Sequence, residues 1–216
     1  MSSNKTTKVK MLGKGSTYQI KETHYEALES LIEHARESMT SPIAIHFISH
    51  IHDAEQFKES KRNFIKNFER GLKRQFKGSK QNCPEVLIAY SVEFKYTTQK
   101  EIDSSDGVYK RGNSVWEKTK EQLPFLHLHM HVIADCNKTY PTTFKNKAIE
   151  TLNCIDGLRA SRYSTSCYGD LYKKVKTDYA DVFQRLLYIG KIEQKSSMIP
   201  YKKTFGTSKI PKKVCA

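Results

Sequence analysis

The sequence lacks any apolar run long enough to cross a membrane. No window approaches the roughly 18 consecutive apolar residues of a spanning helix, and the N-terminus has no apolar core of the kind found in signal peptides. We therefore expect a soluble protein of the cytoplasm that has no membrane partner.

Paired cysteines and a nucleotide-binding motif are also missing. The five cysteines are widely spaced and contain no C-x-x-C pair, so the sequence indicates neither a disulfide framework nor a cysteine-rich zinc site. The fragment "LGKGST" near the N-terminus does not have the G-x-x-x-x-G-K-[ST] spacing of a phosphate loop. We find no internal repeat. These absences argue against a nucleotide-driven motor and a repeat protein.

Acidic residues are scarce relative to basic ones. Among 216 residues, 37 Lys and Arg face 23 Asp and Glu, which gives a formal net charge of +14. An excess of this size predicts a polyanionic partner, with nucleic acid first. The length favours one domain, which we place at residues 21–209, between a basic, poorly ordered arm at 1–20 and a basic tail at 210–216.

Hydrophobic periodicity predicts an α+β fold with a central antiparallel sheet covered by helices. Strands are expected just after Pro42, in "PEVLIAYSVEFKYTT" and in the histidine-containing run that follows. A polar hairpin excursion is expected at 98–122, and a connection rich in Gly, Ser and Tyr at 156–170. Helices are expected at 22–39, 54–80, 142–155 and 176–195.

Three histidines alternate with apolar residues in "PFLHLHMHVIADC". Successive side chains of a strand point to opposite faces, so His127, His129 and His131 share one face at separations of roughly 6.5 to 7 Å. Two such imidazoles can converge on one cation, and Glu93, at the end of the preceding strand, can add a carboxylate. Ordinary hydrogen-bonded sheet histidines are the alternative, and "SHIHD", with His50 and His52, offers a second metal site.

A tyrosine on the last predicted helix is a candidate nucleophile. Helical spacing places Tyr188 and Lys191 on the polar face, whereas Tyr179 points to the core. A phenol is a weak nucleophile, but a metal ion and an ammonium group can favour attack on a phosphate. Tyr172, which precedes two lysines, is a competing candidate.

Together these residues resemble a known family. "HLHMHVIAD" is similar to the His-hydrophobic-His metal motif of HUH single-strand endonucleases, and "YIGK" to their Tyr-x-x-Lys nucleophile motif. The closer resemblance, over about residues 43–209, is to the replication initiators of filamentous phages and prophages, the inovirus-type family. The element "KTFGTSK" resembles a short basic segment of that family. Gly190 departs from the pattern, because the family has a better helix former there.

The resemblance implies an HUH-type, RRM-like sheet and a rolling-circle replication initiator that nicks and rejoins single-stranded DNA. It implies that Tyr188 forms a 5′-phosphotyrosine intermediate while Lys191 steadies charge. His129, His131 and Glu93 would hold Mg²⁺ or Mn²⁺, with His127 as a possible substitute. The partners would be single-stranded or hairpin origin DNA and a host helicase and polymerase in a prokaryotic cell.

Basic residues outside the motifs are candidates for contacts to DNA phosphates. The expected set is Lys61, Arg62, Lys73, Arg74, Lys195, Lys203 and Lys209, with Tyr163 and Tyr168 available for base stacking. Other functions remain open at this point: a relaxase or single-strand transposase with the same chemistry, a non-catalytic nucleic-acid-binding protein, and a metal-dependent hydrolase that uses His50, His52 and the histidine triplet.

Overall fold

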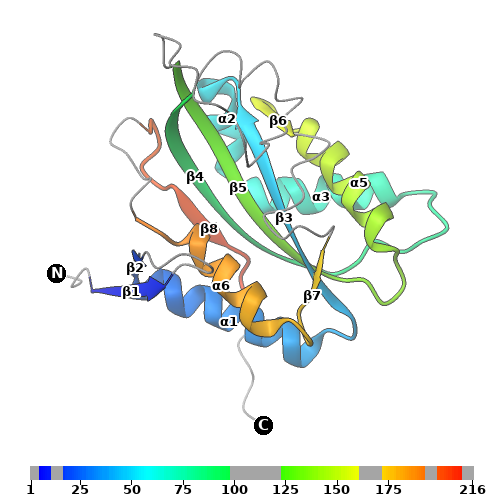
Figure 1. Cartoon of the computed structure of the whole chain (residues 1–216). Helices are drawn as coiled ribbons and strands as arrows, with labels where there is room; N and C mark the ends of the chain where they lie inside the picture. Colours follow the sequence, from blue (N-terminus) through cyan, green and yellow to red (C-terminus); the bar gives the residue numbers. More distant parts are fainter. Residues whose placement is uncertain (1–4, 11–16, 98–122, 161–171, 193–198, 211–216) are drawn as a thin grey trace, which may run out of the picture.

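An antiparallel sheet runs through the centre of the computed structural model, which describes residues 5–10, 17–97, 123–160, 172–192 and 199–210 (Figure 1). Its strands are β3 (Pro42–Ile51), β4 (Val86–Thr97), β5 (Leu123–Asp135), β6 (Leu158–Ala160), β7 (Lys173–Lys174) and β8 (Phe205–Thr207). They lie in the order β6-β3-β5-β4-β8, with β7 paired to β3. The histidine strand β5 is therefore central, between β3 and β4.

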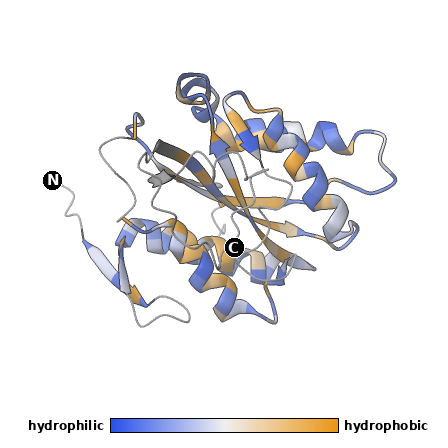
Figure 2. Ribbon diagram, turned by 45° about the horizontal axis from the view of Figure 1, so that its top comes forward, coloured by the Kyte–Doolittle hydropathy of each residue, from blue (hydrophilic) through white to orange (hydrophobic). Residues whose placement is uncertain are grey.

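The two faces of the sheet are chemically different because side chains alternate along each strand. One face carries bulky apolar residues, among them Phe47, Val92 and Met130, and forms the first core. The other face carries small residues such as Ala44 and Ala89 beside the buried polar groups. In Figure 2 the central strands are largely orange, the colour of apolar residues. The predicted α+β class, with an antiparallel sheet between helices, is confirmed.

Helices cover both faces (Figure 1). The first core lies under α2 (Ala54–Lys61), α3 (Phe64–Phe76) and α5 (Pro141–Asn153). The second core, on the polar side, lies under α1 (Glu22–Ser38) and α6 (Tyr179–Ile189). No helix in the described part of the chain has the length and apolarity needed to span a bilayer.

The single helix predicted at 54–80 is wrong, because the chain forms two helices there. Asn63 leaves the helical region, with φ −127° and ψ 33°, so α2 and α3 meet at a bend. The bend lets Phe57 pack edge-on against Phe64, with ring centroids 6.1 Å apart. The second helix ends at Phe76 because Gly78 adopts a left-handed φ of 79°, a conformation that glycine reaches without steric cost.

Part of the predicted poorly ordered arm is instead a β-hairpin. Strands β1 (Thr6–Lys10) and β2 (Thr17–Lys21) pair in antiparallel fashion as a separate sheet. Tyr18 and Ile20 point into the second core, where Ile20 is fully buried. The prediction is wrong for these strands because their apolar residues alternate with lysine and polar residues, and overall composition hides that pattern.

Candidate metal centre

Register places the three histidines of β5 opposite different residues of β4. His127 pairs with Glu93, His129 with Ser91 and His131 with Ala89. The three histidines share one face, as their spacing predicted, and all three are buried there together with Glu93. Glu93 therefore lies opposite the first histidine of the row, His127, and at the far end from His131.

A group of three ligands gathers around Glu93. Its carboxylate oxygen Oε2 lies 3.7 Å from His127 Nε2 and 3.4 Å from His129 Nε2. One ligand atom from each of the three residues can be chosen so that all lie within 4.8 Å of one another. Burial, followed by its charged and titratable neighbours, holds the pKa of His129 well below its usual range, which keeps the imidazole neutral, as a metal ligand must be. This buried group can hold a metal ion.

The structure separates His131 from this group, although we expected His131 to be a ligand together with His129. The His131 ring stacks on His46 of β3, with centroids 4.3 Å apart and an interplanar angle of 18°. His131 lies four residues along the strand from His127, which is roughly 13 Å at 3.3 Å per residue. The two histidines that gather with Glu93 are therefore His127 and His129.

His46 is a functional candidate that the sequence reasoning missed. Its Nε2 lies 2.9 Å from His129 Nδ1, in a fully buried contact between two imidazoles. If Nδ1 of His129 carries the proton, it donates to His46 and Nε2 of His129 keeps a lone pair toward Glu93. Burial, helped by the charges of Arg185 and Lys191, lowers the pKa of His46 to about 3, so His46 is neutral at ordinary pH and can accept. In the sequence, the only indication of a role for His46 was its position four residues before His50.

Lys191 and Tyr188 border the group from the α6 side. The Lys191 ammonium is buried, 3.2 Å from Glu93 Oε2 and 3.4 Å from the centroid of the Tyr188 ring. The Tyr188 ring lies edge-on to His129, with centroids 6.1 Å apart. Tyr188 and Lys191, predicted from the helix, therefore lie next to the acid and the histidines predicted from the strands.

The N-terminal hairpin fixes the segment that follows Tyr188. The backbone of Ile20 bridges that of Lys191, and the N–H of Ile192 donates to Gln19 O at 3.0 Å. A Cβ at Gly190 would lie 2.8 Å from Ile20 Cγ1, and Ile20 Cδ1 would be closer still. Glycine at this position lets the hairpin approach the end of α6. The helix predicted to run to 195 therefore ends at Ile189, although residues 193–195 lie outside the described residues.

The competing tyrosines lie elsewhere. Tyr172 packs against the first core, which lies on the opposite face of the sheet from the buried polar group of Glu93. Tyr179 donates a hydrogen bond to Glu33, and burial followed by this acid raises its pKa to about 12. Both placements disfavour attack on a phosphate at the metal group.

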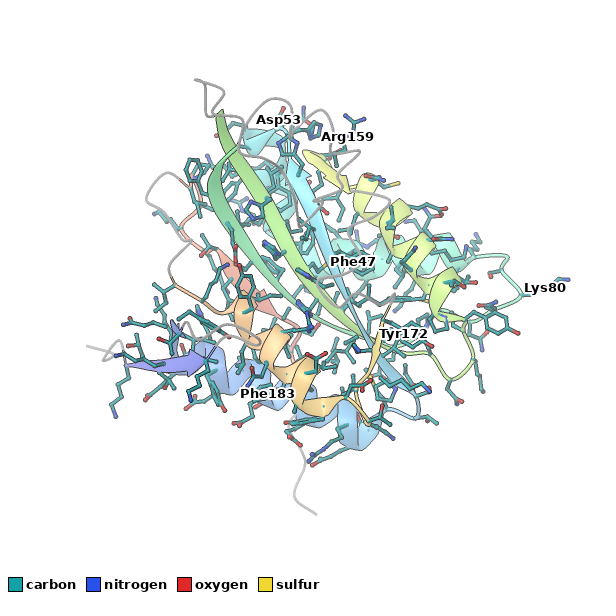
Figure 3. The ribbon with its side chains drawn as sticks, in the orientation of Figure 1. Phe47, Asp53, Lys80, Arg159, Tyr172 and Phe183 are labelled. Atoms are coloured by element: carbon teal, nitrogen blue, oxygen red, sulfur yellow. The ribbon has the colours of Figure 1, made fainter. Side chains whose placement is uncertain are left out.

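The alternative site at His50 and His52 gains no third ligand in the described part of the chain. His50 pairs with Arg159 at the end of the sheet that Asp53 also occupies (Figure 3). Burial, followed by the charges of His52 and Arg159, lowers the pKa of His50 to about 4.

The predicted phosphate-contacting residues divide into groups. Lys61 lies over the ring of Tyr201, and burial together with the Lys203 charge lowers its pKa. Arg62 lies 3.9 Å from Glu59 on the surface. Lys73 and Arg74 are exposed on α3, and Lys203 and Lys209 are exposed near β8. Lys195, Tyr163 and Tyr168 lie outside the described residues.

Comparisons with protein-family models, curated proteins and solved structures found no match to this chain.

Proposed function

We propose that the chain is a rolling-circle replication initiator, a metal-dependent endonuclease that nicks and rejoins single-stranded DNA through Tyr188. The observation that carries the proposal is the meeting of Tyr188 and Lys191 with Glu93 and two buried histidines. The likeness of these residues to the HUH motifs supports the same reading. The net charge of +14 suits a DNA substrate.

The donor set fits a divalent cation. One carboxylate and two neutral imidazoles are typical ligands of Mn²⁺ and related ions, and three protein ligands leave coordination positions open. In this proposal Glu93, His127 and His129 hold Mg²⁺ or Mn²⁺. When bound, the ion supplies Lewis acidity toward a non-bridging phosphate oxygen.

Tyr188 performs the covalent step. Its phenolic oxygen loses its proton to solvent and attacks the phosphorus, forming an O–P bond while the bond from phosphorus to the 3′-oxygen breaks. The 3′-oxygen takes up a proton and leaves as a hydroxyl group. The nearby Lys191 ammonium favours the phenolate and the negative charge that develops at the phosphate. The step replaces one phosphate ester bond with another, so it is reversible. A 3′-hydroxyl can later attack the phosphotyrosine ester and rejoin the strand.

A covalent-adduct assay tests this proposal. The protein is incubated with labelled single-stranded oligonucleotides and Mn²⁺, and adducts are separated on a denaturing gel. We expect an adduct with the wild type and with Tyr172→Phe, and none with Tyr188→Phe or with His129→Ala.

Other outcomes favour other functions. Binding without adduct or cleavage by the wild type over a broad oligonucleotide pool would indicate a non-catalytic binding protein. Cleavage without an adduct that persists in Tyr188→Phe would indicate a hydrolase that uses water. An adduct that persists in Tyr188→Phe would place the nucleophile on another tyrosine.

A further inference from the structure

A basic stripe runs along the outer face of α3, on the far side of the sheet from Glu93. Arg70, Lys73, Arg74 and Lys77 occupy positions i, i+3, i+4 and i+7, so they share one exposed side of the helix. Like charges at these spacings repel each other and destabilise a helix. Within the described residues, none of the four has a carboxylate at ion-pair distance, 4.0 Å or less. Among the residues that the structure describes, no acidic partner therefore neutralises the charge of this stripe.

The stripe borders an open hollow of about 520 Å³ at the end of α3. All four cations line it, and the loop after the helix contributes the polar side chains of Gln81 and Asn82. Lys80, in the same loop, projects away from the body of the protein (Figure 3). A concave surface of cations and amides is suited to the phosphates of a polyanion rather than to an apolar ligand.

An exposed aromatic ring stands beside this hollow. Tyr140 is 70% exposed and is the one large hydrophobic residue that stands out as exposed in the described part of the chain. Its backbone N–H donates to Gln81 Oε1 at 2.9 Å, and the hydroxyl of neighbouring Thr139 donates to Asn82 O. Both acceptors belong to residues that line the hollow, so the backbone of Tyr140 is held next to it, although the Tyr140 ring is not one of the lining side chains.

We propose that the α3 hollow and Tyr140 form a second nucleic-acid site, which binds single-stranded nucleic acid by its phosphates and by stacking one base on Tyr140. A cationic groove next to an exposed aromatic ring is the arrangement that single-strand-binding proteins use, because every base has a face that can stack. In a duplex, the bases are already stacked on each other, so Tyr140 favours a single strand.

This site is independent of the proposed nicking reaction. The hollow belongs to the first-core layer of helices, whereas the metal group lies on the opposite face of the sheet. Binding at the hollow requires neither a metal ion nor Tyr188, and it can be measured in EDTA. Failure of the adduct assay therefore leaves this proposal standing, and failure of this proposal leaves the adduct assay unaffected.

The test uses fluorescence anisotropy of labelled oligothymidylate in EDTA, with a strand of about 20 nucleotides, longer than the usual single-strand site. We expect Tyr140→Ala to weaken binding about tenfold and Tyr140→Phe to change it less than about twofold, since the ring provides the stacking. Binding of a duplex of the same length should change less than about twofold in both variants. Equal affinity of Tyr140→Ala and Tyr140→Phe for the single strand would overturn the proposal.

A charge comparison tests the stripe. The variant Arg70→Gln/Lys73→Gln/Lys77→Gln is compared with Lys174→Gln/Lys176→Gln/Lys202→Gln, which removes the same charge from exposed positions elsewhere. Each phosphate contact with a single strand contributes about 0.7 to the slope of the log of the binding constant against log salt concentration. We therefore expect the first variant, which removes three cations, to reduce this slope by about 2, and the second variant to reduce it by less than about 1. Equal slopes in the two variants would refute the assignment.

A parallel titration with oligouridylate identifies RNA or DNA as the preferred strand by the tighter binding.

Discussion

The contact between His46 and His129 gives a sharp prediction about metal affinity. We expect His46 Nε2, at 2.9 Å from His129 Nδ1, to accept the Nδ1 proton when His129 binds a metal ion and thereby to orient the His129 ring. Replacing His46 with Phe keeps a buried ring beside His131 but removes the acceptor. Loss of such an outer partner typically weakens metal binding by about 10- to 100-fold, so we expect the Kd for Mn²⁺ to rise by that factor.

A second substitution separates hydrogen bonding from packing. In His46→Gln, the side-chain carbonyl can reach the position of Nε2 and accept from His129, so we expect a Kd within about threefold of the wild type. The assay is isothermal titration calorimetry with Mn²⁺ on protein pretreated with EDTA, with thermal melting of each apo variant to confirm folding. If His46→Phe and His46→Gln bind Mn²⁺ equally, the proposed orientation of His129 by His46 is refuted.

Three further predictions concern the same layer of the fold. In Mn²⁺ titrations, Glu93→Gln and His127→Asn should lose binding, whereas the Kd of His131→Phe should stay within about threefold of the wild-type value. Loss of binding in His131→Phe would indicate that His131 is a ligand. Gly190→Ala should lower the free energy of unfolding, measured by urea denaturation, by about 1 to 3 kcal/mol, because its Cβ would overlap Ile20. The double variant Gly190→Ala/Ile20→Val should lose less free energy of unfolding than the sum of the losses in the two single variants. Strict additivity of these losses would contradict the clash. The pKa of His46 is lowered from 6.5 to about 3 in the folded chain, so below pH 6.5 the unfolded chain binds a proton that the folded chain does not. The free energy of unfolding of the metal-free protein should therefore fall from pH 6.5 toward pH 3, and in His46→Phe this fall should be shallower by up to about 1.4 kcal/mol per pH unit. Identical slopes in the two proteins would contradict the lowered pKa.

Periodicity of two predicted the chemistry of the sheet faces well. His127, His129 and His131 were expected to share one face of their strand, and the structure confirms this: all three lie on the buried polar face, whereas Met130 between them belongs to the first core. Alternation is local, so it can be read without knowing which strands pair. The same holds for the amphipathic helix at Glu22–Ser38, which ends within a residue of its expected boundary.

Register could not be obtained in this way. Whether Glu93 lies opposite His127 or His131 depends on where the chain turns between β4 and β5, and shifting that turn slides one strand along the other. His46 gave almost no signal, since a single histidine in an apolar strand becomes informative only when its neighbour on the sheet is known. The hairpin at Thr6–Lys21 was missed because its stability comes from packing against α6 and α1 rather than from its own composition.

The ion pair between Lys191 and Glu93 has a consequence for the order of folding and metal uptake. A fully buried carboxylate is costly when no positive charge accompanies it, and proteins that depend on an ion for that charge unfold when the ion is removed. Here the chain carries its own cation 3.2 Å from Glu93 Oε2. We therefore expect the chain to fold without a metal ion and, if an ion occupies the proposed site, to stay folded when that ion is lost.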